Sequence, residues 1–272
     1  MAYRDILVHL RASGSTEAAT LAVNIAKRFG GHLTGLYALP DVAMFKLMLG
    51  QSSSHVREVE RADYARAGEA ERAFRALAAQ AGIDVEWQVG EGDVAELLCI
   101  AARLKDLVVV GQTEPGDPGR GVAETVVVTA DRPTIVVPSA GRFETVGRRI
   151  LIGWNGSREA ALAVKAAEPL FADAEQVTVL MGKSRETFNA LTRVPPVDVE
   201  AYLKRRGVTP ELRPFDVSDL ESGAALLDMA RQTEADLLVM GAFGRSWLRE
   251  WVLGGATRHV FRSMPIPVLM AH

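Results

Sequence analysis

An internal repeat is the feature that most limits what this chain can fold into. The segments DILVHLRASGSTEAATLAVNIAKRFG, from Asp5, and RILIGWNGSREAALAVKAAEPLF, from Arg149, share a β-branched run followed by a helical pattern. The two halves also end alike, on RPTIVVP and PIPVLMAH. Repetition at this scale indicates two copies of one structural unit. We therefore expect modules over residues 1–140 and 147–272, joined by a linker at about 139–147.

Strand and helix patterns alternate within each copy. The strands expected in the first copy are DILVHL, HLTGLYAL, DVEWQV, DLVVVG and PTIVVP, and those in the second are RILIGW, QVTVLMG, ELRPFDV, DLLVMG and IPVLMA. Alternation of this kind predicts a parallel sheet covered by helices on both faces. The continuously apolar runs LVVVG and LLVMG are typical of strands buried on both sides. The predicted fold class is α/β, with two doubly wound, five-stranded, flavodoxin-like parallel-sheet modules in tandem.

Composition excludes several classes of protein. The chain has 272 residues, 48% hydrophobic and 24% charged, which is ordinary for a globular protein. No apolar run approaches the ~20 residues of a membrane span, and the first strand begins too close to Met1 for a signal peptide. A net charge of −3 without a Lys/Arg block argues against nucleic-acid binding. We expect a soluble, cytoplasmic protein with neither membrane nor nucleic acid as partner.

The sequence nominates no metal site and no catalytic residue. Cys99 is the only cysteine, which excludes internal disulfides and cysteine-rich metal sites, and we interpret it as part of the core. The five histidines lack metal-ligand spacing. No Walker A sequence, nucleophile elbow or acid/base pair is present.

The copies differ most after their second strands. The first carries a long segment at 41–82 and the second a shorter one at 183–207. An Arg-, Glu- and Ala-rich composition over 56–81 predicts a helix lying on the sheet, which we favour over a partner-binding helix. The apolar stretch at 43–49 is interpreted as buried, with an exposed lid or contact as the alternative.

Glycine spacing distinguishes the second copy. In GAFGRSWLREWVLGGAT, Gly241 and Gly244 follow a predicted strand, and Gly254 and Gly255 precede a helical segment. Such glycines allow several backbone N–H groups to converge on one point, and the helix dipole favours an anion there. The arrangement suits a polyphosphate. The alternative is a tight strand exit followed by a glycine cap on the short helix SWLREWVL, without a ligand.

With this spacing the chain resembles the universal stress proteins, whose nucleotide-binding members carry G-x2-G-x9-G-(S/T) after the fourth strand. The resemblance covers nearly the whole chain and is to tandem members. It implies an adenine nucleotide alpha hydrolase-like fold that binds ATP, with or without Mg²⁺, at the carboxyl ends of the strands, where open α/β sheets hold ligands. The binding residues it implies are Trp154, Asn155, Met181, Gly241, Gly244, Arg245, Gly254, Gly255, Ala256 and Thr257.

Two positions of this motif depart from the family pattern. Gly255 stands where the family has Ser or Thr, and Asn155 stands where the first strand usually ends in aspartate. A lost neutral hydrogen bond is worth about 0.5–1.5 kcal/mol, so we expect weakened binding. Thr257 can replace part of the lost hydroxyl, or simply pack in its helix. Arg245 is a better phosphate candidate than Arg249, and Trp154 is either a pocket wall or core.

The corresponding loop of the first copy, GQTEPGDPGRG, is three residues shorter and suits a nucleotide poorly. Its prolines remove backbone donors and its acidic residues repel phosphate. Arg11 also stands at the position of the aspartate. We expect little nucleotide binding here. This copy then serves as a dimer-like partner, or holds an anion through Arg11 and Arg120.

A second glycine pattern, GEGDVAELL, imitates a dinucleotide-binding fingerprint at Gly90, Gly92 and Ala95. That fingerprint belongs to the first βα unit of a domain, whereas this one is the third. We interpret Asp93 as a helix cap.

The functional hypothesis is a stress-response protein that binds ATP in its C-terminal module and acts as a nucleotide-dependent regulator of an unknown protein client. The resemblance implies pairing of the two modules through PTIVVP and PVLMAH and leaves a homodimer open. One alternative is a slow, metal-dependent ATP hydrolase. Another is an interaction scaffold without a nucleotide. Enzymatic activity is thus left undecided.

Overall fold

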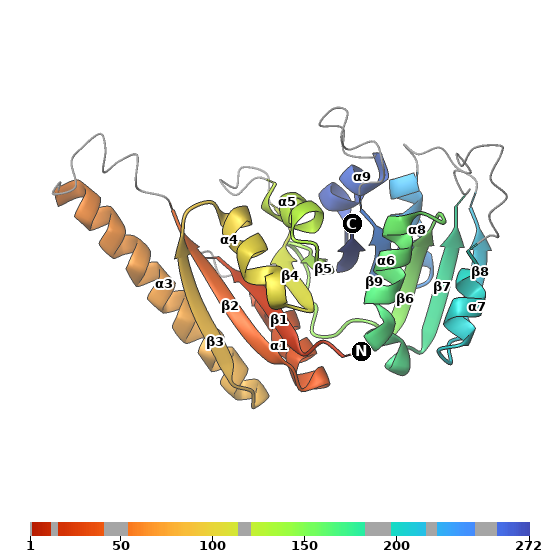
Figure 1. Cartoon of the computed structure of the whole chain (residues 1–272), viewed down its shortest axis with the longest axis horizontal. Coiled ribbons are helices and arrows are strands. Elements are labelled where there is room, and N and C mark those ends of the chain that lie inside the picture. Colours follow the sequence, from red (N-terminus) through yellow and green to blue (C-terminus); the bar gives the residue numbers. More distant parts are fainter. Residues whose placement is uncertain are drawn as a thin grey trace. The chain divides into compact units, whose positions relative to one another are not determined.

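The chain folds into two compact units, Ala2–Glu144 and Thr145–His272. They are seen in a computed structural model (Figure 1). The structure describes residues 2–11, 16–40, 54–113, 121–182, 197–215, 222–242 and 255–272. In this part of the chain, no helix combines the length and the apolar content needed to cross a membrane.

The N-terminal unit is a parallel sheet with the strand order β3-β2-β1-β4-β5. Its elements are β1 (Asp5–Leu10), α1 (Thr16–Phe29), β2 (His32–Leu39), α3 (Ser54–Ala81), β3 (Val85–Glu91), α4 (Val94–Ala101), the 3₁₀ helix η1 (Ala102–Leu104), β4 (Leu107–Gly111), α5 (Val122–Thr129) and β5 (Thr134–Val137).

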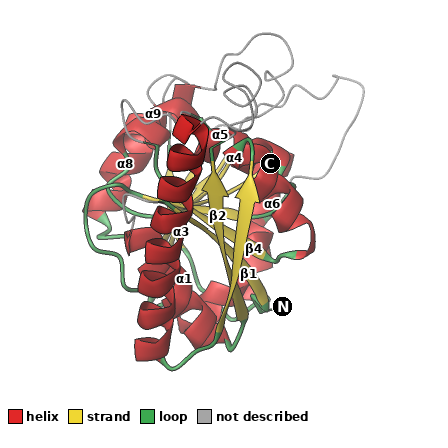
Figure 2. Ribbon diagram, turned by 90° about the vertical axis from the view of Figure 1, so that its left-hand side faces the viewer, coloured by secondary structure: helices red, strands yellow, loops and turns green. Residues whose placement is uncertain are grey.

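Helices cover both faces of this sheet. On one face α1 packs beside α3, the helix expected from the Arg/Glu/Ala-rich segment, which also lies on β2 and β3 (Figure 2). On β3, the ring of Trp87 lies 6.2 Å from that of Phe74 of α3. Gly90, of opposite parity on the same strand, faces Leu97 of α4. Successive strand residues point to opposite faces, so α3 and α4 lie on opposite sides.

The C-terminal unit repeats this plan with the strand order β10-β9-β6-β7-β8, again parallel. Its elements are β6 (Arg149–Trp154), α6 (Arg158–Ala166), the 3₁₀ helix η2 (Glu168–Asp173), β7 (Gln176–Met181), α7 (Val199–Lys204), β8 (Glu211–Pro214), α8 (Ser222–Gln232), β9 (Leu237–Gly241), α9 (Gly255–Ser263) and β10 (Val268–Ala271). Helix α6 packs on β6, β9 and β10, whereas α8 packs against α9.

The predicted fold class is confirmed, and the central strands show why it could be read from the sequence. All five residues of β4 are buried, as are the first four of β9. A strand covered on both faces places every side chain in the core, which explains its unbroken apolar run. Several strands are shorter than expected; β8 ends at Pro214, although the expected segment continued to Val217.

Two local interpretations can also be compared with the structure. Asp93 caps α4, since its carboxylate accepts a hydrogen bond from the Glu96 N–H at 2.9 Å, as expected for a helix start rather than a dinucleotide loop. Cys99 is only half-buried, and its Sγ lies 3.2 Å from Thr129 Oγ1. It therefore lies at the margin of the core rather than inside it. The apolar stretch at 43–49 lies outside the described residues.

Candidate functional site

The carboxyl edge of the C-terminal sheet brings together three of the predicted site residues. Trp154 ends β6, Met181 ends β7 and Gly241 ends β9. Trp154 and Met181 are register partners, and Gly153 pairs with Met240, one residue before Gly241. Parallel pairing aligns the strand ends, so residues from three distant parts of the sequence meet at one edge.

Asn155 begins the turn that leads from β6 into α6. Its Oδ1 accepts a hydrogen bond from the Ser157 N–H at 3.1 Å, and Ser157 Oγ accepts one from the Ala160 N–H at 3.1 Å. The asparagine oxygen thus stabilises the turn, while the serine caps the helix. Asn155 is exposed at this edge, and its amide nitrogen is the group able to donate to a ligand.

Gly241 has a packing role that the sequence did not reveal. A Cβ added at this glycine would lie 2.5 Å from Ala160 N and 2.6 Å from the carbonyl carbon of Glu159. The absence of a side chain lets the first turn of α6 rest directly on the end of β9. A substitution here would displace α6 whether or not a ligand binds.

The predicted residues Gly255, Ala256 and Thr257 form the first turn of α9. This turn lies close against α8, because a Cβ added at Gly223 would lie 2.7 Å from Ala256 O. Thr257 is buried, with 4% of its surface exposed. The structure therefore places a hydroxyl-bearing side chain within the first turn of the helix that follows the glycine-rich loop.

The remaining predicted site residues differ in how deeply they are buried. Trp154 is only 6% exposed and packs as a core residue, so little of its ring is open to a base. Met181 is half-buried, and its carbonyl oxygen accepts a hydrogen bond from Phe215 N–H at 2.9 Å. The predicted residues Gly244, Arg245 and Gly254, together with Arg249, lie outside the described residues.

The equivalent edge of the N-terminal unit is occupied by its own side chains. Gln112 Oε1 accepts a hydrogen bond from the Ser139 N–H at 3.1 Å, and Thr113 Oγ1 donates one to Glu124 Oε2 at 3.4 Å. Glu124 lies in the first turn of α5, so a carboxylate faces the edge where a phosphate would bind. Arg11 is half-buried, and the loop residues 114–120, Arg120 among them, lie outside the described part.

Aligning the two copies identifies residues that inspection of motifs missed. Residues 121–137 and 255–271 align without a gap, which places Thr257 at the position of Ala123, and Arg258 at that of Glu124. Both Ala123 and Thr257 are buried.

The first helices of the two units align on the shared sequence Leu-Ala-Val, at 21–23 and 162–164. Ala18 then matches Glu159, and both are buried.

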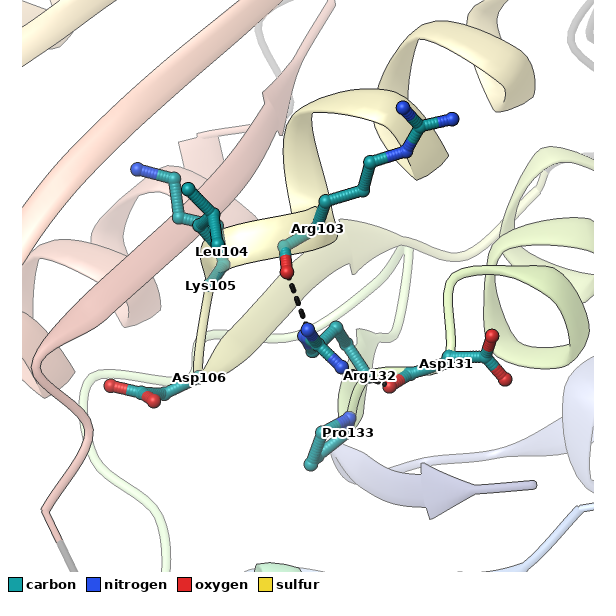
Figure 3. Close-up of a pocket in the computed structure, with 7 residues that line it drawn as sticks. All are labelled: Arg103, Leu104, Lys105, Asp106, Asp131, Arg132 and Pro133. Carbon is teal, nitrogen blue, oxygen red and sulfur yellow. Dashed lines mark hydrogen bonds between the residues drawn. The ribbon is translucent and has the colours of Figure 1, made fainter.

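A shallow depression of about 380 Å³ lies elsewhere, at the amino ends of β4 and β5. Its side chains diverge, and Arg132 turns to donate a hydrogen bond to the Arg103 carbonyl (Figure 3). Lys105 Nζ donates to Thr34 Oγ1 at 2.8 Å. The depression is at the amino edge of the N-terminal sheet, whereas the predicted site is at the carboxyl edge of the other unit's own sheet. Two of its three cations already donate to protein acceptors.

Comparison with known proteins agrees with the fold. The family model described as the Universal stress protein family matches residues 2–138 and again residues 147–272. A universal stress protein of Synechocystis is 29% identical over 148 residues, which is 54% of this chain and 49% of that protein. The match thus spans about half the length of that relative.

Solved structures resemble almost the whole chain. A universal stress protein from Archaeoglobus fulgidus gives a TM-score of 0.71 at 16% identity, with 97% of each chain covered. A putative universal stress protein from Pseudomonas aeruginosa gives a TM-score of 0.55 at 16% identity, covering 98% of this chain and 92% of that one. At such identities the likeness shows the fold. The two family matches, one to each half, show that this chain belongs to the universal stress protein family as a tandem member.

Proposed function

We propose that the C-terminal module binds ATP at the carboxyl edge of its sheet and that the protein acts as a nucleotide-dependent regulator in a stress response. The observation that carries the proposal is the meeting of two features at this edge. Gly241 ends β9 where the G-x2-G-x9-G segment begins, and α9 begins at Gly255, immediately after that segment. A helix N-terminus preceded by glycines is suited to phosphate oxygens.

The difference between the two copies supports placing the ligand in the second. Where the N-terminal unit has Ala123 and Glu124, the C-terminal unit has Thr257 and Arg258. These exchanges add a hydroxyl and replace a carboxylate with a cation in the first turn of the last helix. The second change favours a polyanion, because a carboxylate repels phosphate and a cation attracts it. Thr257 is buried, as Ala123 is, and packs within its unit.

Isothermal titration calorimetry of the full chain with MgATP tests this assignment. The informative loop variant is Gly244→Val, because substitution of Gly241 would also displace α6. Arg11→Ala, at the matching edge of the N-terminal unit, is the control. We expect Gly244→Val to reduce affinity by at least about tenfold and Arg11→Ala to leave it unchanged.

Either of two results would contradict the proposal. Wild-type protein that binds neither ATP nor ADP would favour an interaction scaffold. Loss of binding in Arg11→Ala with binding retained in Gly244→Val would move the site to the N-terminal unit. Incubation of the complex with Mg²⁺ and measurement of ADP release then decides whether the bound ATP is hydrolysed.

A further inference from the structure

Strand β3 forms one edge of the N-terminal sheet. Its whole length, Val85–Glu91, pairs with β2 on one side, and within the described residues no strand pairs with its other side (Figure 1). The Gly92 N–H, just past the strand, donates to Leu39 O of β2 at 3.2 Å. Because the backbone groups of successive strand residues point in opposite directions, the odd-numbered residues of β3 direct their N–H and C=O groups outward. The outer edge of β3 is thus a row of backbone donors and acceptors able to pair with another strand.

The corresponding edge of the C-terminal unit is protected against such pairing. β8 has four residues and ends at Pro214. The Phe215 N–H donates to Met181 O of β7 at 2.9 Å, so the same alternation directs Leu212 and Pro214 outward. Proline has no N–H to donate, and short edge strands that contain proline resist pairing with other chains. β3 has seven residues and no proline, so one copy of the repeat carries this protection and the other does not.

The side chains at the outer edge of β3 differ in character along its length. Val89 is 42% exposed, and it lies on the face of Trp87, which packs on α3. Near the amino end, Arg75 of α3 donates from Nη1 to the outward carbonyl of Val85 at 3.2 Å. Glu91 is exposed at the carboxyl end and lies on this same face by strand alternation. The edge therefore has a cation at one end, apolar side chains in the middle and a carboxylate at the other end.

This edge is complementary to itself about a twofold axis through Gln88, the middle residue of β3. Antiparallel pairing with β3 of a second copy, centred on Gln88, sets Val85 opposite Glu91 and Trp87 opposite Val89. The outward backbone groups of the two strands then face each other, and each of these pairs can exchange two hydrogen bonds. Pairing of Trp87 with Val89 also joins an aromatic and a β-branched side chain, a favourable cross-strand combination.

The charges agree with this register. The second copy's Glu91 comes beside the guanidinium of Arg75, and symmetry repeats the contact. Arg75 already binds Glu71 through Nε at 2.8 Å, but a guanidinium has further N–H donors and can bind a second carboxylate. On the other face of the strand, Glu86 comes opposite Gly90, so the register sets no two carboxylates of β3 against each other. Backbone hydrogen bonds, an apolar centre and opposite charges thus favour the same pairing.

We propose that two copies of the chain associate through their N-terminal units by antiparallel pairing of β3 with β3. Each copy contributes the same surface, so the contact closes as a dimer and leaves no free β3 edge for further growth. The N-terminal unit, which lacks the G-x2-G-x9-G segment, then supplies the contact between chains. This inference goes beyond nucleotide binding and does not depend on it.

Sedimentation velocity of the full chain over a range of concentrations tests the pairing. Val89→Pro removes one outward N–H at a position where an edge strand tolerates proline, whereas Val89→Ala removes the same side chain but keeps the donor. Leu212→Pro is the matched control, because Leu212 faces outward from β8 and is 38% exposed. Far-UV circular dichroism verifies that each variant is folded. We expect a wild-type dimer whose dissociation constant is raised at least about tenfold by Val89→Pro, less by Val89→Ala and not at all by Leu212→Pro.

Cross-linking tests the register independently. Gln88 faces its own counterpart across the axis, so Gln88→Cys in a Cys99→Ser background should form a disulfide between chains on oxidation. Leu212→Cys in the same background should not. A wild type that stays monomeric up to about 0.1 mM would overturn the inference. So would a dimer that Val89→Pro does not weaken, or one in which Gln88→Cys fails to cross-link.

Discussion

Asp106 and Asp236 hold equivalent positions in the two units, and each carboxylate accepts backbone hydrogen bonds from the start of its unit's first strand. Asp106 Oδ2 accepts from Arg4 N at 2.8 Å and from Asp5 N at 3.0 Å. Asp236 uses both oxygens: Oδ1 accepts from Gly147 N and Arg149 N, and Oδ2 from Arg148 N, all at 3.0 Å. These contacts fix the amino end of β1 beside β4 and that of β6 beside β9.

The two carboxylates accept their hydrogen bonds differently, so replacing each aspartate with asparagine should lower the free energy of unfolding by a different amount. Asp106→Asn can keep both hydrogen bonds on one oxygen, so we expect a small loss of stability. Asp236→Asn must set an NH₂ group against one backbone N–H, and we expect it to destabilise the C-terminal unit by about 1–3 kcal/mol. Scanning calorimetry of both variants gives the comparison. Equal losses would show that charge, rather than geometry, controls the effect.

The close approach at Gly241 predicts that even one methyl group is harmful. Gly241→Ala would place its Cβ 2.5 Å from Ala160 N, so α6 must move and we expect a loss of roughly 2 kcal/mol or more. Gly30→Ala is the control, because its φ is +59° but no atom lies within 4 Å of the added Cβ. It should cost only the backbone strain, about 1 kcal/mol. Urea denaturation of both variants measures the two losses of stability. A Gly241→Ala variant as stable as Gly30→Ala would contradict the packing role.

The ionised carboxyl of Glu168 stabilises the folded protein, and we expect this contribution to be lost in acid. Burial raises the pKa of this carboxyl, but hydrogen bonds from Arg206 and Tyr202 outweigh it, so the pKa lies below its ordinary value. A lowered pKa in the folded state contributes stability above the unfolded pKa, and this is lost as pH falls through the folded pKa. Because the group is partly exposed, we expect Glu168→Gln to cost no more than about 1 kcal/mol at pH 7.

Stability of wild type and Glu168→Gln measured from pH 7 to pH 3 should therefore converge in acid. Tyr202→Phe keeps the Arg206 ion pair and should retain most of the pH dependence. Parallel curves for wild type and Glu168→Gln over this whole range would argue against the assignment.

Gly255 lacks the hydroxyl of the family pattern, so we expect a substitution that restores it to tighten ATP binding. Gly255→Ser supplies the side chain that the family pattern has at this position, and a hydrogen bond from its hydroxyl to an anionic phosphate oxygen would tighten ATP binding by about tenfold or more. Gly255→Ala is the matched control, since alanine favours a helix over glycine at least as much as serine does but has no hydroxyl. Titration calorimetry should show tighter binding for serine alone. If alanine gave the same gain, preorganisation of α9 would be the cause.

The sequence by itself determined the repeated unit, the parallel strands and the edge at which the candidate residues Trp154, Met181 and Gly241 meet. The spacing of apolar residues within short segments is enough to reveal these features. For example, β4 and β9 are uninterrupted apolar runs because helices cover both of their faces. Asp93 was recognisable as a helix cap for the same reason, since its partner is only three residues away.

Only the tertiary structure decided how the individual candidate residues pack. Gly241 resembles a phosphate-loop glycine in the sequence, but its contact with α6 joins residues about eighty positions apart. Trp154 could have been a pocket wall until its burial was known. Glu159 has the sequence of an ordinary first-turn glutamate, which is usually exposed and favoured by the helix dipole. Its burial depends on how α6 packs against the sheet, and a local pattern carries no information about which turn of a helix approaches which strand.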